Sequence, residues 1–276
     1  MNYLRLSYKR WIGWLLVAIV FAIACVFLSQ WQFDRRAHRV AEISLVEKNY
    51  DASPIALDAK MLEGQTSKVN SLKWHPVSVS GHYLPDQAVL ARNRPKSGQP
   101  GFESVVPFVT DAGAILAVSR GWLPTGNLQD SPDSIPLPSP EAQTITARLV
   151  PSEQKVDRAA PTGQVANLHL PAIAESTGLD LNTSWYLVMQ SESVPQAKAP
   201  AQLLRPSTDE GNHLSYALQW ILFGILAFAV LVWAIRREYE FYLVQTDPSF
   251  VPKKKRSTRS DKDNDAEDGS DLLLLL

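Results

Sequence analysis

One long uncharged run constrains the fold of this chain more than any other feature. Residues Asn212 to Ile235 read NHLSYALQWILFGILAFAVLVWAI and contain no Lys, Arg, Asp or Glu. The run is close to the ~20 apolar residues that a helix needs to cross a bilayer. Arg236 and Arg237 follow it at once, whereas no basic residue lies between Arg205 and the run. Since Lys and Arg are enriched in cytoplasmic loops, we expect a transmembrane helix over 213–235 whose end faces the cytoplasm.

A second uncharged run lies near the N-terminus, WIGWLLVAIVFAIACVFLSQWQF over residues 11–33. It is longer than the apolar region of a typical signal peptide, and no clear cleavage site follows it, so we expect a retained transmembrane helix after a short cytoplasmic segment, 1–10. Three arginines follow this run and would by count favour the cytoplasm: Arg35, Arg36 and Arg39. Because long domains translocate largely regardless of such charges, two spans place both termini in the cytoplasm.

Small residues recur along one face of each predicted span. In the first span they are Ala18, Ala22, Cys25 and Ser29, and in the second Ala217, Gly224 and Ala227. Small residues let helices approach closely, so we predict that the two spans pack together along these faces. The alternative is that the seam faces lipid or another protein.

Composition excludes several classes of protein. With 45% hydrophobic residues and a formal net charge of −1, the chain is neither a disordered protein nor a nucleic-acid binder. Cys25 is the only cysteine, so no intramolecular disulfide or paired-thiolate metal site can form. GxSxG, HExxH, GxxxxGK[ST] and GxGxxG are all absent, and no nucleophile is placed with a base. We therefore expect no enzymatic activity.

Between the spans, residues 34–212 predict one β-rich α+β extracytoplasmic domain, an antiparallel sheet or small barrel. Alternating apolar residues predict strands from about Lys73 to Tyr83, and over 87–91, 102–110, 114–120, 143–150 and 185–190. We expect the first two strands to form a hairpin and the next two a second hairpin, around Asp111-Ala112-Gly113.

The sequence also predicts helices and irregular segments outside these strands. The stretch after the first span predicts a polar helix to about Tyr50, and Asn167 is expected to cap a helix over Leu168–Thr177 that Gly178 ends. Residues 191–211 predict a polar linker. The Lys- and Asp-rich segment 236–276 predicts a disordered cytoplasmic tail.

The start of the second span carries the main candidate site. His213, Tyr216, Ala217 and Trp220 are spaced so that they share one helical face. Trp and Tyr anchor helices at the membrane interface, which is one interpretation of this face. The other is a ligand site, because a neutral imidazole binds transition metals and haem iron.

Two basic spots in the domain are further candidates. Arg92, Arg94 and Lys96 share one loop, and Arg120 precedes Gly121-Trp122. Arginines in such places can clamp a carboxylate or a phospholipid headgroup, or can be paired with acidic residues at the surface.

Several short motifs, in this order, resemble the SURF1/Shy1 family over nearly the whole chain. They are Trp31-Gln32 with Arg35, Gly81-His82-Tyr83, Pro100-Gly101, Ser119-Arg120-Gly121-Trp122-Leu123-Pro124, and Asn212-His213-Leu214-Ser215-Tyr216-Ala217-Leu218-Gln219-Trp220. The loop Ala-Arg-Asn-Arg-Pro before Pro100 departs from the shorter turn of many relatives, so no role is carried onto Arg92 or Arg94.

The resemblance implies a cytochrome c oxidase assembly factor without a reaction of its own, which helps to deliver haem a or to hold it transiently. Its partners would be the catalytic subunit, other assembly factors and the lipid bilayer. The histidine of the family's second span falls on His213, which would ligate haem iron. Tyr216 and Trp220 would pack on the porphyrin, and Arg120 would meet a propionate. The alternative is a scaffold that binds oxidase subunits without touching haem. A third hypothesis, an enzyme that acts on haem or lipid, would need a base or nucleophile in the domain, and the sequence offers no such group of residues.

Only ten residues precede the first span, too few for an Arg- and Ser-rich transit peptide. We therefore expect a bacterial cytoplasmic membrane rather than a mitochondrial inner membrane.

Overall fold

A computed structural model describes residues 3–58, 61–62, 70–194, 196–247 and 249–250. The chain divides into two compact units, one made of Met1–Arg35 and Asn212–Leu276 and the other of Arg36–Gly211. The greater part of the predicted tail, residues 251–276, lies outside the described residues.

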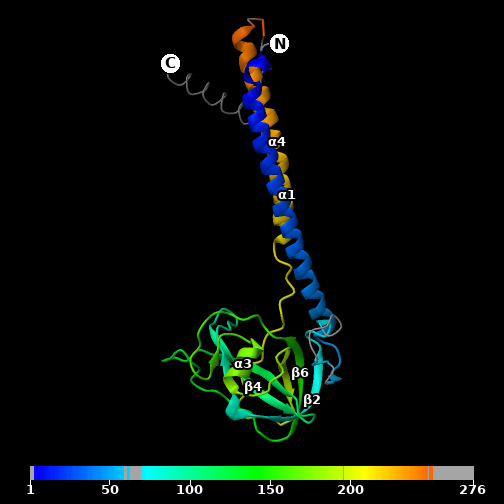
Figure 1. Cartoon of the computed structure of the whole chain (residues 1–276), viewed down its shortest axis with the longest axis vertical. Coiled ribbons are helices and arrows are strands. Elements are labelled where there is room, and N and C mark those ends of the chain that lie inside the picture. Colours follow the sequence, from blue (N-terminus) through cyan, green and yellow to red (C-terminus); the bar gives the residue numbers. More distant parts are fainter. Residues whose placement is uncertain (1–2, 59–60, 63–69, 195, 248, 251–276) are drawn as a thin grey trace, which may run out of the picture. The chain divides into compact units, whose positions relative to one another are not determined.

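The first unit contains α4 (His213–Thr246) and the part of α1 (Tyr3–Asn49) up to Arg35, and the rest of α1 belongs to the second unit (Figure 1). Both are long and apolar enough to cross a membrane, which fits a membrane protein. The polar helix expected up to about Tyr50 is confirmed as the last part of α1. Helix α4 continues past Ile235 to Thr246, into the segment predicted as tail, and Glu238 in this extension pairs with Arg10 of α1.

The predicted seam between the spans is confirmed. Ala18, Cys25, Ser29 and Ala217 are buried, although each lies in a run of exposed apolar residues. A Cβ placed on Gly224 of α4 would lie 3.6 Å from the Cβ of Cys25. Small side chains at these positions thus allow α1 and α4 to pack closely.

The second unit is built on an eight-stranded sheet among the described residues. Its elements in chain order are β1 (Ile55–Ala56), β2 (Pro76–Tyr83), the short 3₁₀ helix η2 (Pro85–Gln87), β3 (Val89–Ala91), β4 (Gly101–Thr110), β5 (Ile115–Pro124), β6 (Gln143–Pro151), β7 (Gln164–Val165), α3 (Leu170–Thr177) and β8 (Trp185–Glu192).

The strands close on themselves. Strand β2 pairs with β6, β6 with β8, β8 with β5, β5 with β4, and β4 again with β2. This ring is a small barrel, one of the two predicted forms. The sheet is mixed rather than antiparallel, because β8 runs parallel to β5. Helix α3 precedes β8 and is part of the connection that brings the strand back in this direction.

Alternation along the strands divides their apolar residues between two clusters. One cluster includes Phe108, Leu116, Leu149 and Trp185, all with 0% exposure. The other joins residues of β3, β4, β5, β6, β7 and β8 to α3 and includes Tyr186 and Ile173. Strands β4, β5 and β8 contribute to both clusters and are largely buried on both faces, whereas β2 exposes Ser80 and His82 on one face.

The predicted hairpin of the first two strands is wrong. Strands β2 and β3 do not pair with each other but lie one after the other along β4, with Tyr83 opposite Phe108 and Val89 opposite Val105. The 3₁₀ turn at Pro85–Gln87 steps the chain along the same edge instead of reversing it. The second hairpin, β4 with β5, is confirmed.

The predicted cap of α3 is also wrong. The N-cap is His169, and the amide of Leu170 donates to Ser152 Oγ at 3.0 Å. Asn167 instead donates to the carbonyl of Gln154. A hydroxyl from a distant part of the chain thus replaces the local cap, while Gly178 ends the helix in the left-handed conformation as predicted.

The linker to α4 lies against the second unit. Ala201 exchanges two backbone hydrogen bonds with Trp122 of β5, at 2.7 and 2.9 Å. Further along, Arg205 pairs with Asp51, and Arg39 of α1 donates to the carbonyls of Ser207 and Asp209. The segment predicted as a plain polar linker is therefore fixed to the domain and to the polar end of α1.

Candidate functional site

His213 is the first residue of α4, and its side chain contacts α1. Its Nδ1 lies 2.9 Å from Oε1 of Gln32. An amide oxygen only accepts hydrogen bonds, so Nδ1 donates this bond, and the Nδ1–H tautomer has its lone pair on Nε2. A hydrogen bond at one ring nitrogen that fixes the tautomer and orientation of the other is the usual arrangement of a histidine ligand.

The predicted aromatic neighbours follow on the same helix. Tyr216 is 50% exposed, and Trp220 is half-buried and packs edge-on against Phe223, with ring centroids 5.9 Å apart. The buried Ala217 between them faces α1. The structure thus brings His213, Tyr216 and Trp220 together at one end of α4, with an exposed ring available to a planar ligand.

Arg120 belongs to the other unit and is fully buried there. Its guanidinium donates to both carboxylate oxygens of Glu192, at 2.9 and 3.1 Å, and to the carbonyl of Pro136 at 2.9 Å. Its charge is thus paired inside the domain. The predicted contact with a propionate stays a prediction, while the observed contacts give Arg120 a structural role.

Tyr83 completes this buried cluster. Its hydroxyl donates to Glu192 at 3.0 Å, and its ring lies below the Arg120 guanidinium at 5.5 Å. Burial, and then the charge of Glu192, raise the pKa of Tyr83 well above its usual range. The cluster joins the Gly-His-Tyr and Arg-Gly-Trp motifs, so both motifs position one buried ion pair.

Gly121 and Trp122 of the Arg-Gly-Trp motif contact the linker at Ala201. A Cβ on Gly121 would lie 2.6 Å from the carbonyl oxygen of Ala201, and the residue has φ +143°. Glycine is thus required where the linker crosses β5. The indole of Trp122 donates to the carbonyl of Arg94 at 2.6 Å.

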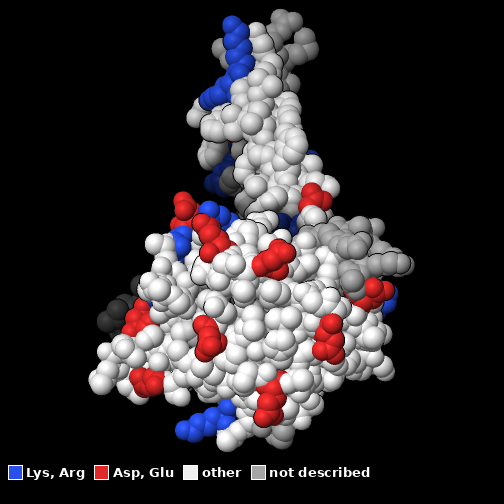
Figure 2. Space-filling view, turned by 60° about the horizontal axis from the view of Figure 1, so that its bottom comes forward, with Lys and Arg blue, Asp and Glu red and all other residues white. Residues whose placement is uncertain are grey.

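One face of the molecule shows how charged side chains are distributed (Figure 2). On the face in Figure 2, acidic side chains are scattered singly over the domain, and the described Lys and Arg residues form no continuous patch. Within the described ranges, no three His, Cys, Asp or Glu residues are grouped so that they could hold a metal ion. His213 is therefore a single candidate ligand rather than part of a protein-only metal site.

The SURF1 family model matches residues 19–225. This chain belongs to the SURF1 family. A SURF1-like protein of Mycobacterium tuberculosis, described as uncharacterized, is 34% identical over 232 residues, which cover 81% of this chain and 83% of the relative. A SURF1-like protein of Rickettsia bellii is 27% identical over 80% of this chain and 89% of its own. The cytochrome oxidase assembly protein SHY1 of Saccharomyces cerevisiae is 22% identical over 51% of this chain and 37% of its own.

The SURF1 match runs from α1 into α4 and so includes both sides of the His213–Gln32 contact. Sequence reasoning named Trp31-Gln32 as a motif but not Gln32 as the partner of His213. The sequence could have indicated this pair, because Gln32 lies near the end of one apolar run and His213 lies near the start of the other. For Glu192, an isolated acidic residue at a strand end, no comparable signal existed.

Proposed function

We propose that this SURF1 family protein assists the assembly of cytochrome c oxidase by holding haem a for its catalytic subunit, without catalysing a reaction. The observation that carries the proposal is the His213–Gln32 hydrogen bond, which leaves Nε2 as a free ligand atom at the end of an apolar helix pair. The name of the yeast relative supports the oxidase as the partner.

The residues at this end of α4 fit a haem. His213 would supply the iron ligand, oriented by Gln32, and the exposed ring of Tyr216 together with Trp220 would cover the porphyrin. Bound haem a would supply the redox-active iron that the mature oxidase needs, and here it is cargo. The part of this chain is to orient one imidazole and to present apolar surface beside it.

The same proposal includes a topology. The basic pair Arg236 and Arg237 after the apolar part of α4 supports a cytoplasmic C-terminal side, and α1 then returns the N-terminus to that side. The second unit would lie outside the cytoplasm, in a bacterial cytoplasmic membrane. Partners would include the catalytic subunit and other assembly factors within the bilayer.

The test is the visible absorption spectrum of the detergent-purified full chain from cells that make haem a. We expect a Soret band in the wild type, its loss in His213→Ala, and its retention in His38→Ala, which removes an exposed histidine elsewhere on α1. Gln32→Leu is expected to weaken and shift the band, because the imidazole loses its orienting acceptor. Gln30→Leu, an exposed neighbour, is the matched control.

The outcomes separate this proposal from a scaffold that never touches haem. A folded wild-type protein without a Soret band, which still restores oxidase activity to a deletion strain, favours the scaffold. A band that His213→Ala leaves unchanged removes His213 as the ligand. Failure of the wild-type chain to restore oxidase activity overturns the role in assembly itself.

A further inference from the structure

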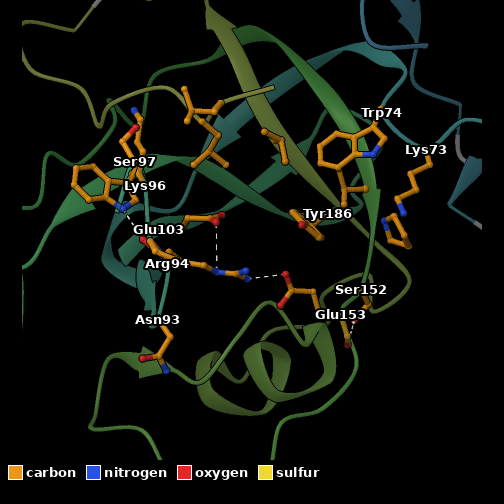
Figure 3. A pocket seen from close by; sticks show the side chains of 17 residues that line it. Lys73, Trp74, Asn93, Arg94, Lys96, Ser97, Glu103, Ser152, Glu153 and Tyr186 are labelled. Carbon is orange, nitrogen blue, oxygen red and sulfur yellow. Dashed lines mark hydrogen bonds and ion pairs between the residues drawn. The ribbon is translucent and has the colours of Figure 1, made fainter. Parts of the chain in front are cut away.

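We propose that a pocket on the second unit binds a small amphipathic carboxylate, an organic acid with an apolar or aromatic body. The pocket has a volume of about 580 Å³, within the usual range for small-molecule sites. Figure 3 shows Trp74 with Lys73 at one side, Lys96 and Ser97 at the other, and Arg94, Glu103 and Glu153 along the floor. This site is independent of His213.

Backbone strain gathers at this pocket. Among the described residues, those other than glycine with positive φ are Trp74 (φ 70°), Asn93 (φ 55°) and Ser97 (φ 52°), and all of them line it. A bulky aromatic residue such as Trp74 is a clear outlier in this region. Strained conformations of this kind cost about 1–3 kcal/mol each and cluster at binding sites, where they hold side chains in place.

The floor of the pocket is a buried ion network. The guanidinium of Arg94 lies 2.7 Å from a carboxylate oxygen of Glu153 and 3.3 Å from one of Glu103. The other oxygen of Glu103 accepts from Ser119 Oγ at 2.7 Å, and the second oxygen of Glu153 accepts from the amide of Leu168 at 3.0 Å. Each carboxylate oxygen named here thus has a partner within the protein.

Donors, in contrast, remain available. Arg94 donates a hydrogen bond to Glu153 through Nη2, whereas its Nε is ion-paired with Glu103 at 3.3 Å and has no hydrogen-bond partner. Lys96 donates one hydrogen bond to the carbonyl of Gln202, at 2.7 Å, and lies over the Trp122 ring. Burial raises the pKa of Tyr186, and Glu103 and Glu153 raise it further, so its hydroxyl stays a donor. A pocket with spare donors and committed acceptors favours an anion.

Aromatic and aliphatic walls define the rest of the ligand. The indole of Trp74 lies at one side of the cavity (Figure 3). Trp122, whose ring centroid lies 5.7 Å from Lys96 Nζ, also lines it, and Leu203 and Val188 add aliphatic surface. Lys73, at the rim, pairs with Glu42 of α1. An acid whose carboxylate contacts Lys96 and Arg94, and whose body packs against the apolar lining, satisfies both the charged and the apolar parts of the pocket.

The experiment uses the full chain in detergent and photolabelling with 4-benzoylbenzoate, followed by mass spectrometry of the labelled peptides. The positions of the labelled peptides distinguish photolabel bound in the pocket from photolabel dissolved in the detergent micelle. We expect adducts on pocket residues such as Trp74 and Leu203, at a yield about tenfold above that of the neutral analogue 4-(hydroxymethyl)benzophenone. Unlabelled 2-naphthoate is expected to compete.

Lysine variants test the charge. Lys96→Gln is expected to lower pocket labelling about tenfold and Lys96→Arg to restore it, while Lys198→Gln, an exposed linker lysine, leaves it unchanged. A melting temperature close to the wild type shows that Lys96→Gln is folded. Equal pocket labelling by the neutral analogue, a preference for a trimethylammonium analogue, or adducts confined to α1 and α4 would each overturn the proposal.

Discussion

The surroundings of Arg120 determine what a substitution there does. Its side chain is 0% exposed and that of Glu192 is 8% exposed, so removing either partner leaves a buried charge without its counterion. We predict that Arg120→Met costs about 3–5 kcal/mol of unfolding free energy and that the double variant Arg120→Met/Glu192→Met regains much of it. Denaturant unfolding followed by tryptophan fluorescence measures both. A cost below about 1 kcal/mol for the single variant would refute a structural role.

The buried carboxyl of Glu103 makes the stability of the domain depend on pH. Burial raises the pKa of this carboxyl above its ordinary 4.5, although Arg94 and Ser119 oppose the shift. The folded state then holds the proton more tightly than the unfolded chain, so the contribution of Glu103 to stability is complete below pH 4.5 and is lost as the pH rises through the folded pKa. We predict that the stability of the wild type relative to Glu103→Gln falls as the pH rises above 4.5. An advantage that grows over this range would contradict the raised pKa.

The contact of the linker with β5 depends on Gly121. We predict that Gly121→Ala displaces the linker and speeds tryptic cleavage after Lys198 about tenfold, because the Cβ would meet the Ala201 carbonyl and backbone strain costs ~1–3 kcal/mol. Gly113→Ala is the control, since Gly113 also has positive φ (+84°) but has nothing within 4 Å of its Cβ. Equal cleavage of the two variants would show that the clash does not govern the linker.

The packing of α1 on α4 can be tested with the native cysteine. The 3.6 Å from the Cβ built on Gly224 to the Cβ of Cys25 lies in the range of a disulfide. We predict that Gly224→Cys forms an intramolecular disulfide with Cys25 under mild oxidation in membranes, seen as a shift on a non-reducing gel. Gly13→Cys, at a site open to its surroundings, is expected to give no such bond.

The helices and most strands could be predicted because their signals are local. Period-two alternation marked β4, β5, β6 and β8, and uncharged runs marked the two spans. The pairing order could not be predicted, since β8 enters between β6 and β5, far from its neighbours in sequence. The cap of α3 was missed for the same reason, because Ser152, which follows β6, lies 18 residues before Leu170 in the sequence.

The candidate residues on α4 followed from their spacing, but their partners did not. The bond of Gln32 to His213 depends on how the two helices align, and the ion pair of Arg120 depends on closure of the barrel. The pocket was not predicted at all, because its lining comes from separate loops and strands. Only the basic cluster Arg94 and Lys96 pointed to it, as a possible anion clamp.

Taken together, the contacts of the linker explain the arginines after the first apolar run. Arg36 pairs with Glu210 at 2.7 Å, and Arg39 holds two linker carbonyls. Their contacts give these arginines a structural role, since they hold the linker. The linker thus lies against the polar end of α1 within the second unit.

The position of β8 between β6 and β5 affects how the barrel can fold while the chain is being translated. It is the last strand of the domain, yet it closes the ring between β6 and β5. The ring therefore stays open until the ribosome has made the chain to Glu192 and that segment has reached the same compartment. Until then β5 and β6 expose unpaired edges, which are prone to aggregation. A chain that stops before Trp185 is a substrate for proteases, whereas one that reaches Glu192 can close its barrel.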